Sequence, residues 1–304
     1  MAYLHSDREQ FRDAIDLAYE QTGVMVQAIE KDYYVTMLLR LLAQRMPYIV
    51  FKGGTSLSKC HKVIRRFSED IDITIDTLLS QGQKKKIKQA IVESAEKLGM
   101  TIENLDETRS RRDYNRYVIT YDSVIPMASD ALKAAVLLET SYTAVSFPTV
   151  LLPVHSYIGD MMEQEAPDVI EEYNLNPFEM KVQGIDRTLA DKVFAVCDYY
   201  LQGKVAKHSR HLYDIYKLLP LVPQDENFKE LVKEVRAVRE QSVICPSALP
   251  EADVPELLEK IIKEKAYKQD YDSLTTQLLE ETVPYDTVIA ALKKVAENSL
   301  FENN

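Results

Sequence analysis

Several features that mark other classes of protein are missing from this 304-residue chain. Tryptophan is absent, and no stretch approaches the roughly 18 consecutive apolar residues that suggest a transmembrane helix. The first residues show no basic segment followed by an apolar one, so a secretory signal peptide is not predicted. We therefore expect a cytoplasmic protein that does not use a membrane.

Cysteine is also scarce. Cys60, Cys197 and Cys245 are odd in number, lie far apart and lack CxxC spacing, which argues against a disulfide framework and a cysteine zinc site. The formal net charge of -11 argues against a protein that coats nucleic acid through its overall charge. A local basic patch can still bind a small RNA, because phosphate contacts are made locally.

The most informative segment that is present runs from Phe67 to Asp76. Acidic or hydroxyl residues at positions 70, 72, 74 and 76 alternate with isoleucines at 71, 73 and 75, which predicts a strand with one apolar face. Asp70 and Asp72 then project from the other face, with Cα atoms about 6.5–7 Å apart. Two carboxylates on a rigid strand can bind the same Mg²⁺ ion.

A glycine turn precedes this strand. The segment 48–51 predicts a short buried strand that runs directly into Gly53 and Gly54, where backbone can approach a ligand closely. A helix expected from about Thr55 would point its free N–H groups at the same place, as phosphate-binding helices do. Each feature alone is more often a plain turn or a solvated edge, whereas their combination in this order favours a phosphate and metal site.

These residues resemble a known family. The segments 51–59 and 66–73 look like the first motif of the AbiEii/AbiGii nucleotidyltransferase toxins, which belong to the DNA polymerase β-like nucleotidyltransferase superfamily. Residues 186–195 resemble the second motif, whose lysine would be Lys192. Residues 210–218 resemble the next motif, whose aspartate would be Asp214. With a similar helix at 30–35, the resemblance covers about residues 25–220.

The resemblance implies roles for individual side chains. A third acid is expected on a strand beside the paired acids, and Glu139, in the apolar segment 136–141, is the best candidate, although it could be a surface residue at a strand end. Lys192 would stabilise the pyrophosphate, unless it is a surface lysine, and Asp214 would orient a cation or the nucleotide, unless it forms a buried structural salt bridge. The nucleotide would be bound by Gly53, Gly54, Thr55, Ser56, Lys59, Arg66 and Ser68.

The remaining pattern predicts strands first and helices afterwards. Strands are expected near residues 48–51, 70–76, 100–105, 113–122, 132–141 and 149–155. Beyond about residue 157 helices are expected over residues 185–201, 208–219, 228–238, 255–267 and 285–301. We predict an α+β fold: a polymerase β-like nucleotidyltransferase core at 1–157 with a mixed β-sheet flanked by helices, and a helical domain at 158–304 that contributes Lys192 and Asp214 to a cleft.

The predicted activity is transfer of NMP from an NTP to an acceptor hydroxyl, with one or two Mg²⁺ ions held by Asp70, Asp72 and Glu139. The resemblance implies a toxin of a bacterial toxin–antitoxin or phage-defence system, with a cognate antitoxin and tRNA 3′ ends as the acceptor. Arg109, Arg111, Arg112 and Arg116 lie among tyrosines and could either bind RNA or form an exposed hairpin turn. Nucleotidylation of a protein hydroxyl and a nucleotide-binding module without catalysis are the alternatives.

Overall fold

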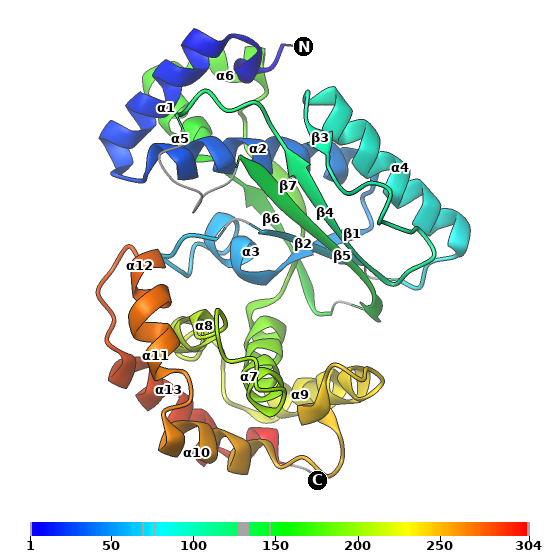
Figure 1. The fold of residues 1–304 in the computed structure, drawn as a ribbon, viewed down its shortest axis with the longest axis vertical. Coiled ribbons are helices and arrows are strands. Elements are labelled where there is room, and N and C mark those ends of the chain that lie inside the picture. The colour runs from blue at the N-terminus through cyan, green and yellow to red at the C-terminus, as the bar shows by residue number, and fades with distance from the viewer. Residues whose placement is uncertain (1, 69, 76, 127–133, 146, 303–304) are drawn as a thin grey trace. The chain divides into compact units, whose positions relative to one another are not determined.

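The computed structural model describes residues 2–68, 70–75, 77–126, 134–145 and 147–302 (Figure 1). Asp76, part of the predicted acidic strand, lies outside these residues. The chain divides into two compact units. Unit 1 comprises Met1–Cys60 and Ser68–Val182, and unit 2 comprises His61–Phe67 and Gln183–Asn304.

Unit 1 contains a seven-stranded mixed sheet with the strand order β3-β4-β5-β2-β1-β7-β6. The strands are β1 (Ile49–Lys52), β2 (Asp70–Ile75), β3 (Thr101–Ile102), β4 (Tyr114–Thr120), β5 (Ala135–Val145), β6 (Thr149–Val154) and β7 (Phe178–Gln183). Strand β2 lies at the centre of the sheet, antiparallel to β1 and parallel to β5. The acidic strand is therefore held on both edges by hydrogen-bonded neighbours.

The helices of unit 1 are η1 (Leu4–Ser6), α1 (Arg8–Thr22), α2 (Val26–Arg45), α3 (Gly53–Lys59), α4 (Gln81–Lys97), α5 (Tyr157–Glu165) and α6 (Pro167–Tyr173). Among them, α2 and α4 lie along the apolar face of this sheet, and α1 packs on α2 (Figure 1). Ile71, Ile73 and Ile75 are at most 1% exposed and share one core with apolar residues of α2 and α4. Burial of the isoleucine face, as the alternation predicted, leaves Asp70 and Asp72 on the opposite face.

Local signals set the ends of the first helix. Asp7 caps α1, with its side chain accepting a hydrogen bond from the Gln10 N–H. Gly23 ends the helix in the left-handed conformation at φ 69°, which a glycine adopts at little cost. Both ends follow from local sequence, because capping depends on residues only a few positions apart.

The sequence analysis did not predict β7, and the expectation that strands end near residue 157 was wrong at this point. Phe178, Met180 and Val182 alternate with polar residues, so a period-two signal was present but short. Strand β7 pairs in parallel with β1, with Phe51 opposite Val182. Strand β7, α5 and α6 fall within the compact unit 1, beyond the predicted boundary at residue 157.

Unit 2 consists of helices, as expected for the C-terminal part. They are α7 (Ile185–Leu201), α8 (Arg210–Leu218), α9 (Glu226–Glu240), η2 (Pro246–Ala248), α10 (Val254–Glu264), α11 (Lys268–Asp270), the π-helix η3 (Tyr271–Thr275), α12 (Thr276–Leu278), α13 (Tyr285–Glu297) and η4 (Ser299–Phe301). In the part of the chain that the structure describes, none of the helices has the length and apolar composition needed to cross a membrane.

The segment His61–Phe67 also belongs to unit 2, where the C-terminal part of the chain holds it in an extended form. Arg66 forms an antiparallel bridge with Leu279. The Phe67 N–H donates to the Leu278 carbonyl at 2.9 Å, and the Glu280 N–H donates to the Arg65 carbonyl at 3.0 Å. Residues more than 200 positions later in the chain thus fix the backbone of the segment just before β2.

Candidate active site

The acidic residues of unit 1 belong to one row of charges that crosses four adjacent strands. Strand pairing places Lys52 of β1 opposite Asp72 of β2, and Asp72 opposite Glu139 of β5. Glu139 in turn lies opposite Arg116 of β4. Residues directly opposite one another share a face of the sheet, so two carboxylates lie between two cations.

Asp70 is on the same face as this row, two positions before Asp72 and opposite Leu137. The three predicted acids therefore share one face of two hydrogen-bonded strands, as the sequence analysis expected for Glu139. Carboxylate oxygens are the ligands that Mg²⁺ prefers. As the side chains are placed, however, no three acidic, histidine or cysteine residues in the described ranges gather closely enough to form a metal cluster.

Gly53 lies directly beneath the carboxylate of Asp72. Its φ is +80°, and a Cβ atom built on it would be 2.0 Å from Asp72 Oδ2 and 2.9 Å from Asp72 Cγ. Any other residue would thus meet both a strained backbone and the carboxylate of Asp72. The glycine turn and the acidic strand, which are predicted to form one phosphate and metal site, are in direct contact.

The helix α3 begins at Gly53 and is seven residues long, slightly earlier than the predicted start at Thr55. The Thr55 and Ser68 hydroxyls are hydrogen-bonded at 2.9 Å, so the glycine turn is tied to a residue two positions before the acidic strand. The Ser56 hydroxyl donates to the Gly53 carbonyl at 2.9 Å. These three side chains stabilise the turn itself.

Lys59, predicted to bind nucleotide, is buried and forms an ion pair with Asp32 of α2. The second oxygen of Asp32 accepts a hydrogen bond from the Tyr157 N–H at 3.0 Å. Lys59 therefore joins α3 to α2 in this structure, and its role at a nucleotide stays a prediction.

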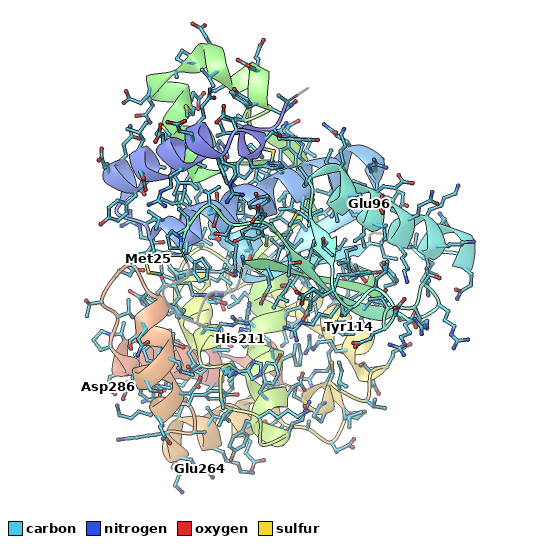
Figure 2. The ribbon with its side chains drawn as sticks, turned by 45° about the horizontal axis from the view of Figure 1, so that its top comes forward. Met25, Glu96, Tyr114, His211, Glu264 and Asp286 are labelled. Atoms are coloured by element: carbon cyan, nitrogen blue, oxygen red, sulfur yellow. The ribbon has the colours of Figure 1, made fainter. Side chains whose placement is uncertain are left out.

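Two residues of β4 lie next to Glu139 on the same face of the sheet. The Arg116 guanidinium is 3.7 Å from the Glu139 carboxylate, measured from Nε to Oε1, and Tyr114, opposite Ser141, is the diagonal neighbour of Glu139. Burial first, and then the negative charges of Glu139 and Asp72, raise the pKa of Tyr114. Tyr114, labelled in Figure 2, is thus close to the acids of both β2 and β5.

The three remaining predicted residues meet in a separate cluster within unit 2. Arg66 donates two hydrogen bonds to Asp214, with Nε to Oδ1 at 2.7 Å and Nη2 to Oδ2 at 2.9 Å. Lys192 Nζ lies 3.0 Å from Asp214 Oδ2. All three side chains are buried, so the alternative of a surface lysine is wrong and the buried salt bridge at Asp214 is present.

His211 completes this cluster (Figure 2). Its Nδ1 lies 3.1 Å from Lys192 Nζ, and because an ammonium only donates, Nδ1 accepts and the imidazole is neutral. Burial and the nearby Lys192 lower the pKa of His211 to about 3. Burial alone would raise the pKa of Asp214, but Arg66 and Lys192 hold it well below its ordinary value.

Comparison with known proteins shows which family this chain belongs to. A family model described as "Nucleotidyl transferase AbiEii toxin, Type IV TA system" matches residues 36–294. This chain belongs to the AbiEii family. The protein is therefore a nucleotidyltransferase toxin of the type IV toxin–antitoxin class, and such enzymes generally use an NTP and a divalent metal ion.

A solved structure shows the same fold. The AbiEii chain aligns with MenT4, a nucleotidyltransferase toxin from Mycobacterium tuberculosis H37Rv, with a TM-score of 0.51 and 16% sequence identity. The alignment covers 93% of this chain and 88% of MenT4. No curated protein sequence matches the chain. The predicted nucleotidyltransferase fold, with a mixed β-sheet flanked by helices, is thereby confirmed.

Within this AbiEii protein, three residues next to the predicted site residues were not assigned to the site from sequence. Strand register places Lys52 and Tyr114 beside the acids, and a side-chain contact places His211 beside Lys192. Arg116 was predicted to bind RNA or to form a hairpin turn, and strand register places it opposite Glu139. Lys52 immediately precedes the glycine turn, so its position in the motif was a usable signal. The roles predicted for Lys192 and Asp214 at a nucleotide stay predictions.

Proposed function

We propose that this AbiEii enzyme transfers a nucleoside monophosphate from an NTP to the 3′ hydroxyl of a tRNA, in a reaction that requires Mg²⁺. The acceptor oxygen forms a bond to the α-phosphorus while the bond from that phosphorus to pyrophosphate breaks. The observation that carries the proposal is the strand register that places Asp72 beside Glu139, directly above Gly53.

Asp70, Asp72 and Glu139 are the residues that would hold Mg²⁺, because they are the three carboxylates on one face of two paired strands. When bound, the ion stabilises charge on the attacking and leaving oxygens. Aspartate and glutamate side chains change rotamer readily, so the strand register supports the metal site more strongly than the direction of each carboxylate does. The glycine turn would bring backbone N–H groups close to the phosphates.

The two cations at the ends of this row of charges can bind the phosphates of the same substrate. Lys52 and Arg116 flank the acids, and phosphate oxygens are the groups that lysine and arginine bind best on such a surface. Arg109, Arg111 and Arg112 are exposed just before β4 on the same unit, although the protein as a whole is acidic. An exposed arginine cluster beside the acids supports an RNA acceptor, which approaches through its phosphate backbone.

The direct test is incubation of the purified protein with each α-labelled NTP, Mg²⁺, and either total tRNA or a pool of proteins. We expect label on tRNA, loss of labelling with EDTA, and turnover reduced to background by Asp70→Ala and by Asp72→Ala. Asp122→Ala is the matched control, because it removes a carboxylate of the same unit whose side chain is 87% exposed. Label on protein and none on RNA would reject the tRNA acceptor.

The cellular part of the proposal concerns the antitoxin. We expect induced expression of the chain to stop bacterial growth and a neighbouring gene to restore it. The Asp72→Ala variant, expressed at the same level, should leave growth unaffected. Growth arrest by this variant equal to that by the wild-type chain would show that toxicity does not depend on nucleotidyl transfer.

A further inference from the structure

The ammonium of Lys192 is held by two acceptors on the neighbouring helix α8. Asp214 Oδ2 lies 3.0 Å from Lys192 Nζ, and His211 Nδ1 lies 3.1 Å from it. The two acceptors are three positions apart on α8, and residues at this spacing share one face of a helix. Helix α7, which carries Lys192, packs directly on α8. The direction of the ammonium therefore depends on His211 as well as on Asp214.

The imidazole of His211 is itself held by a ring of α7. Tyr199 lies seven positions after Lys192, on the same face of α7. Its ring is nearly parallel to that of His211, with centroids 5.7 Å apart and planes at 8°. Offset parallel packing is a favourable arrangement of two aromatic rings. It holds the plane of the imidazole, so that Nδ1 keeps its hydrogen bond to Lys192.

The charges of this cluster do not balance. Arg66 and Lys192 are positive and both contact Asp214, although Arg66 already donates to both oxygens of that carboxylate. His211 adds an acceptor without adding a negative charge, because its imidazole is neutral. These four side chains therefore carry one net positive charge in a buried place, where an unbalanced charge favours binding of an anion.

Lys192 also keeps a donor for a ligand. An ammonium has three N–H groups, and within the described residues the acceptors that contact it are Asp214 and His211. The side chains of Lys192 and His211 are each 11% exposed, whereas that of Asp214 is fully buried. The third N–H of Lys192 is thus available to an oxygen that arrives from solvent.

We propose that His211 is a positioning residue for Lys192: its neutral imidazole directs the ammonium toward a phosphate oxygen of the bound NTP and leaves the positive charge uncancelled. This inference rests on the proposed function, in which the enzyme uses an NTP, and on the role predicted for Lys192. It gives a reason why a neutral acceptor, and not a second carboxylate, lies beside Lys192.

Three substitutions at His211 separate the hydrogen bond from the charge. His211→Asn keeps a neutral acceptor close to the position of Nδ1, His211→Asp puts a carboxylate of the same size there, and His211→Leu removes the acceptor. The labelled-NTP assay with Mg²⁺ gives kcat/KM for the NTP that is used best. We expect His211→Asn to stay within about threefold of the wild type, and His211→Asp and His211→Leu to fall by about 100-fold.

A purely structural role of His211 predicts a different order. A carboxylate accepts from an ammonium more strongly than a neutral amide does, so His211→Asp would then retain at least as much activity as His211→Asn. The comparison of these two variants, which have the same size, is therefore decisive. All rates are compared at a temperature at which circular dichroism shows every variant to be folded.

Two further measurements connect the effect to Lys192. Once Lys192→Met is present, His211→Leu should lower kcat/KM by no more than about twofold, because the two side chains act as one unit. His208→Leu is the matched control. His208 stacks on the same Tyr199 ring, with centroids 3.5 Å apart, but within the described residues no hydrogen bond joins it to Lys192. This variant should keep the wild-type kcat/KM.

The outcomes distinguish this proposal from the proposed function. A wild-type chain that labels no acceptor with any NTP overturns the proposed function, and the role of His211 with it. Loss of turnover in Asp72→Ala together with the wild-type kcat/KM in Lys192→Met overturns the roles of Lys192 and His211 and leaves the proposed function standing. Wild-type kcat/KM in His211→Leu, or activity in His211→Asp equal to that in His211→Asn, overturns the role of His211 alone.

Discussion

Replacing Gly53 by alanine tests the contact between the glycine turn and the acidic strand. The new Cβ would be 2.0 Å from Asp72 Oδ2, so the carboxylate of Asp72 must rotate away. An L-residue in the left-handed region costs about 1–2 kcal/mol, and forcing Asp72 off its rotamer costs about 0.5–1.5 kcal/mol more. Alanine also lowers the conformational entropy of the unfolded chain, which stabilises the folded state by about 0.4–1 kcal/mol. The expected net loss of stability is about 2 kcal/mol.

The loss of activity should be much larger than the loss of stability. A displacement of a catalytic group by about 1 Å can cost 10²-fold in rate, so we expect kcat for nucleotidyl transfer to fall by at least about 100-fold. Unfolding in urea, with the midpoint and slope compared between variants, measures the stability. The labelled-NTP assay, run under conditions in which both proteins are fully folded, measures the rate of nucleotidyl transfer.

Gly23→Ala is the matched control for this experiment. Gly23 has nearly the same backbone conformation, at φ +69°, but nothing lies within 4 Å of a Cβ built on it. The strain of a left-handed alanine is therefore present without the collision, and kcat should stay at the wild-type value. Wild-type activity in Gly53→Ala, or equal loss of activity in both variants, would refute the link between the turn and Asp72.

Three further predictions concern side chains of α8 in unit 2. Asp214→Asn leaves the Arg66 and Lys192 charges without a partner and should lower the free energy of unfolding by about 3–5 kcal/mol, measured in urea; a loss under 1 kcal/mol would contradict this. The folded pKa of His211 is about 3 and the unfolded value about 6.5, so between these values only the unfolded chain binds this proton. Stability should therefore decrease as the pH is lowered from about 6.5 to about 3, and His211→Asn should flatten this slope by up to about 1.4 kcal/mol per pH unit. Tyr213→Phe removes the hydroxyl that accepts from the Arg65 N–H at 3.0 Å and should cost about 1–3 kcal/mol, read from thermal unfolding; a melting temperature equal to that of the wild type would show that the hydroxyl is dispensable.

The sequence predicted the elements around the site because their signals are local. Alternation over six residues indicated β2, and a glycine pair after a buried strand indicated the turn to α3. The short strand β7 was missed, since six residues with three apolar positions are a weak signal between helices. Its place in the sheet depends on pairing with β1, which is more than 120 positions earlier.

Residues that meet through long-range packing could be predicted only as far as the family resemblance extended. Arg66 and Asp214 were each singled out, but nothing in the sequence indicated that they form a bidentate ion pair with each other. The contact depends on how the segment before β2 packs among the helices of unit 2. His211 was not predicted as a member of this cluster, because a histidine in a helix has no local pattern that indicates its partner.

The sequence by itself determined which residues of this protein carry charge, which face of β2 is apolar and where the chain needs a glycine, because each depends on neighbours within a few positions. Tertiary structure decided that Asp72 lies between Lys52 and Glu139, and that Arg116 lies opposite Glu139. The physical reason is that strand register is set by the packing of whole faces, and a shift of one residue would turn every acid toward the core.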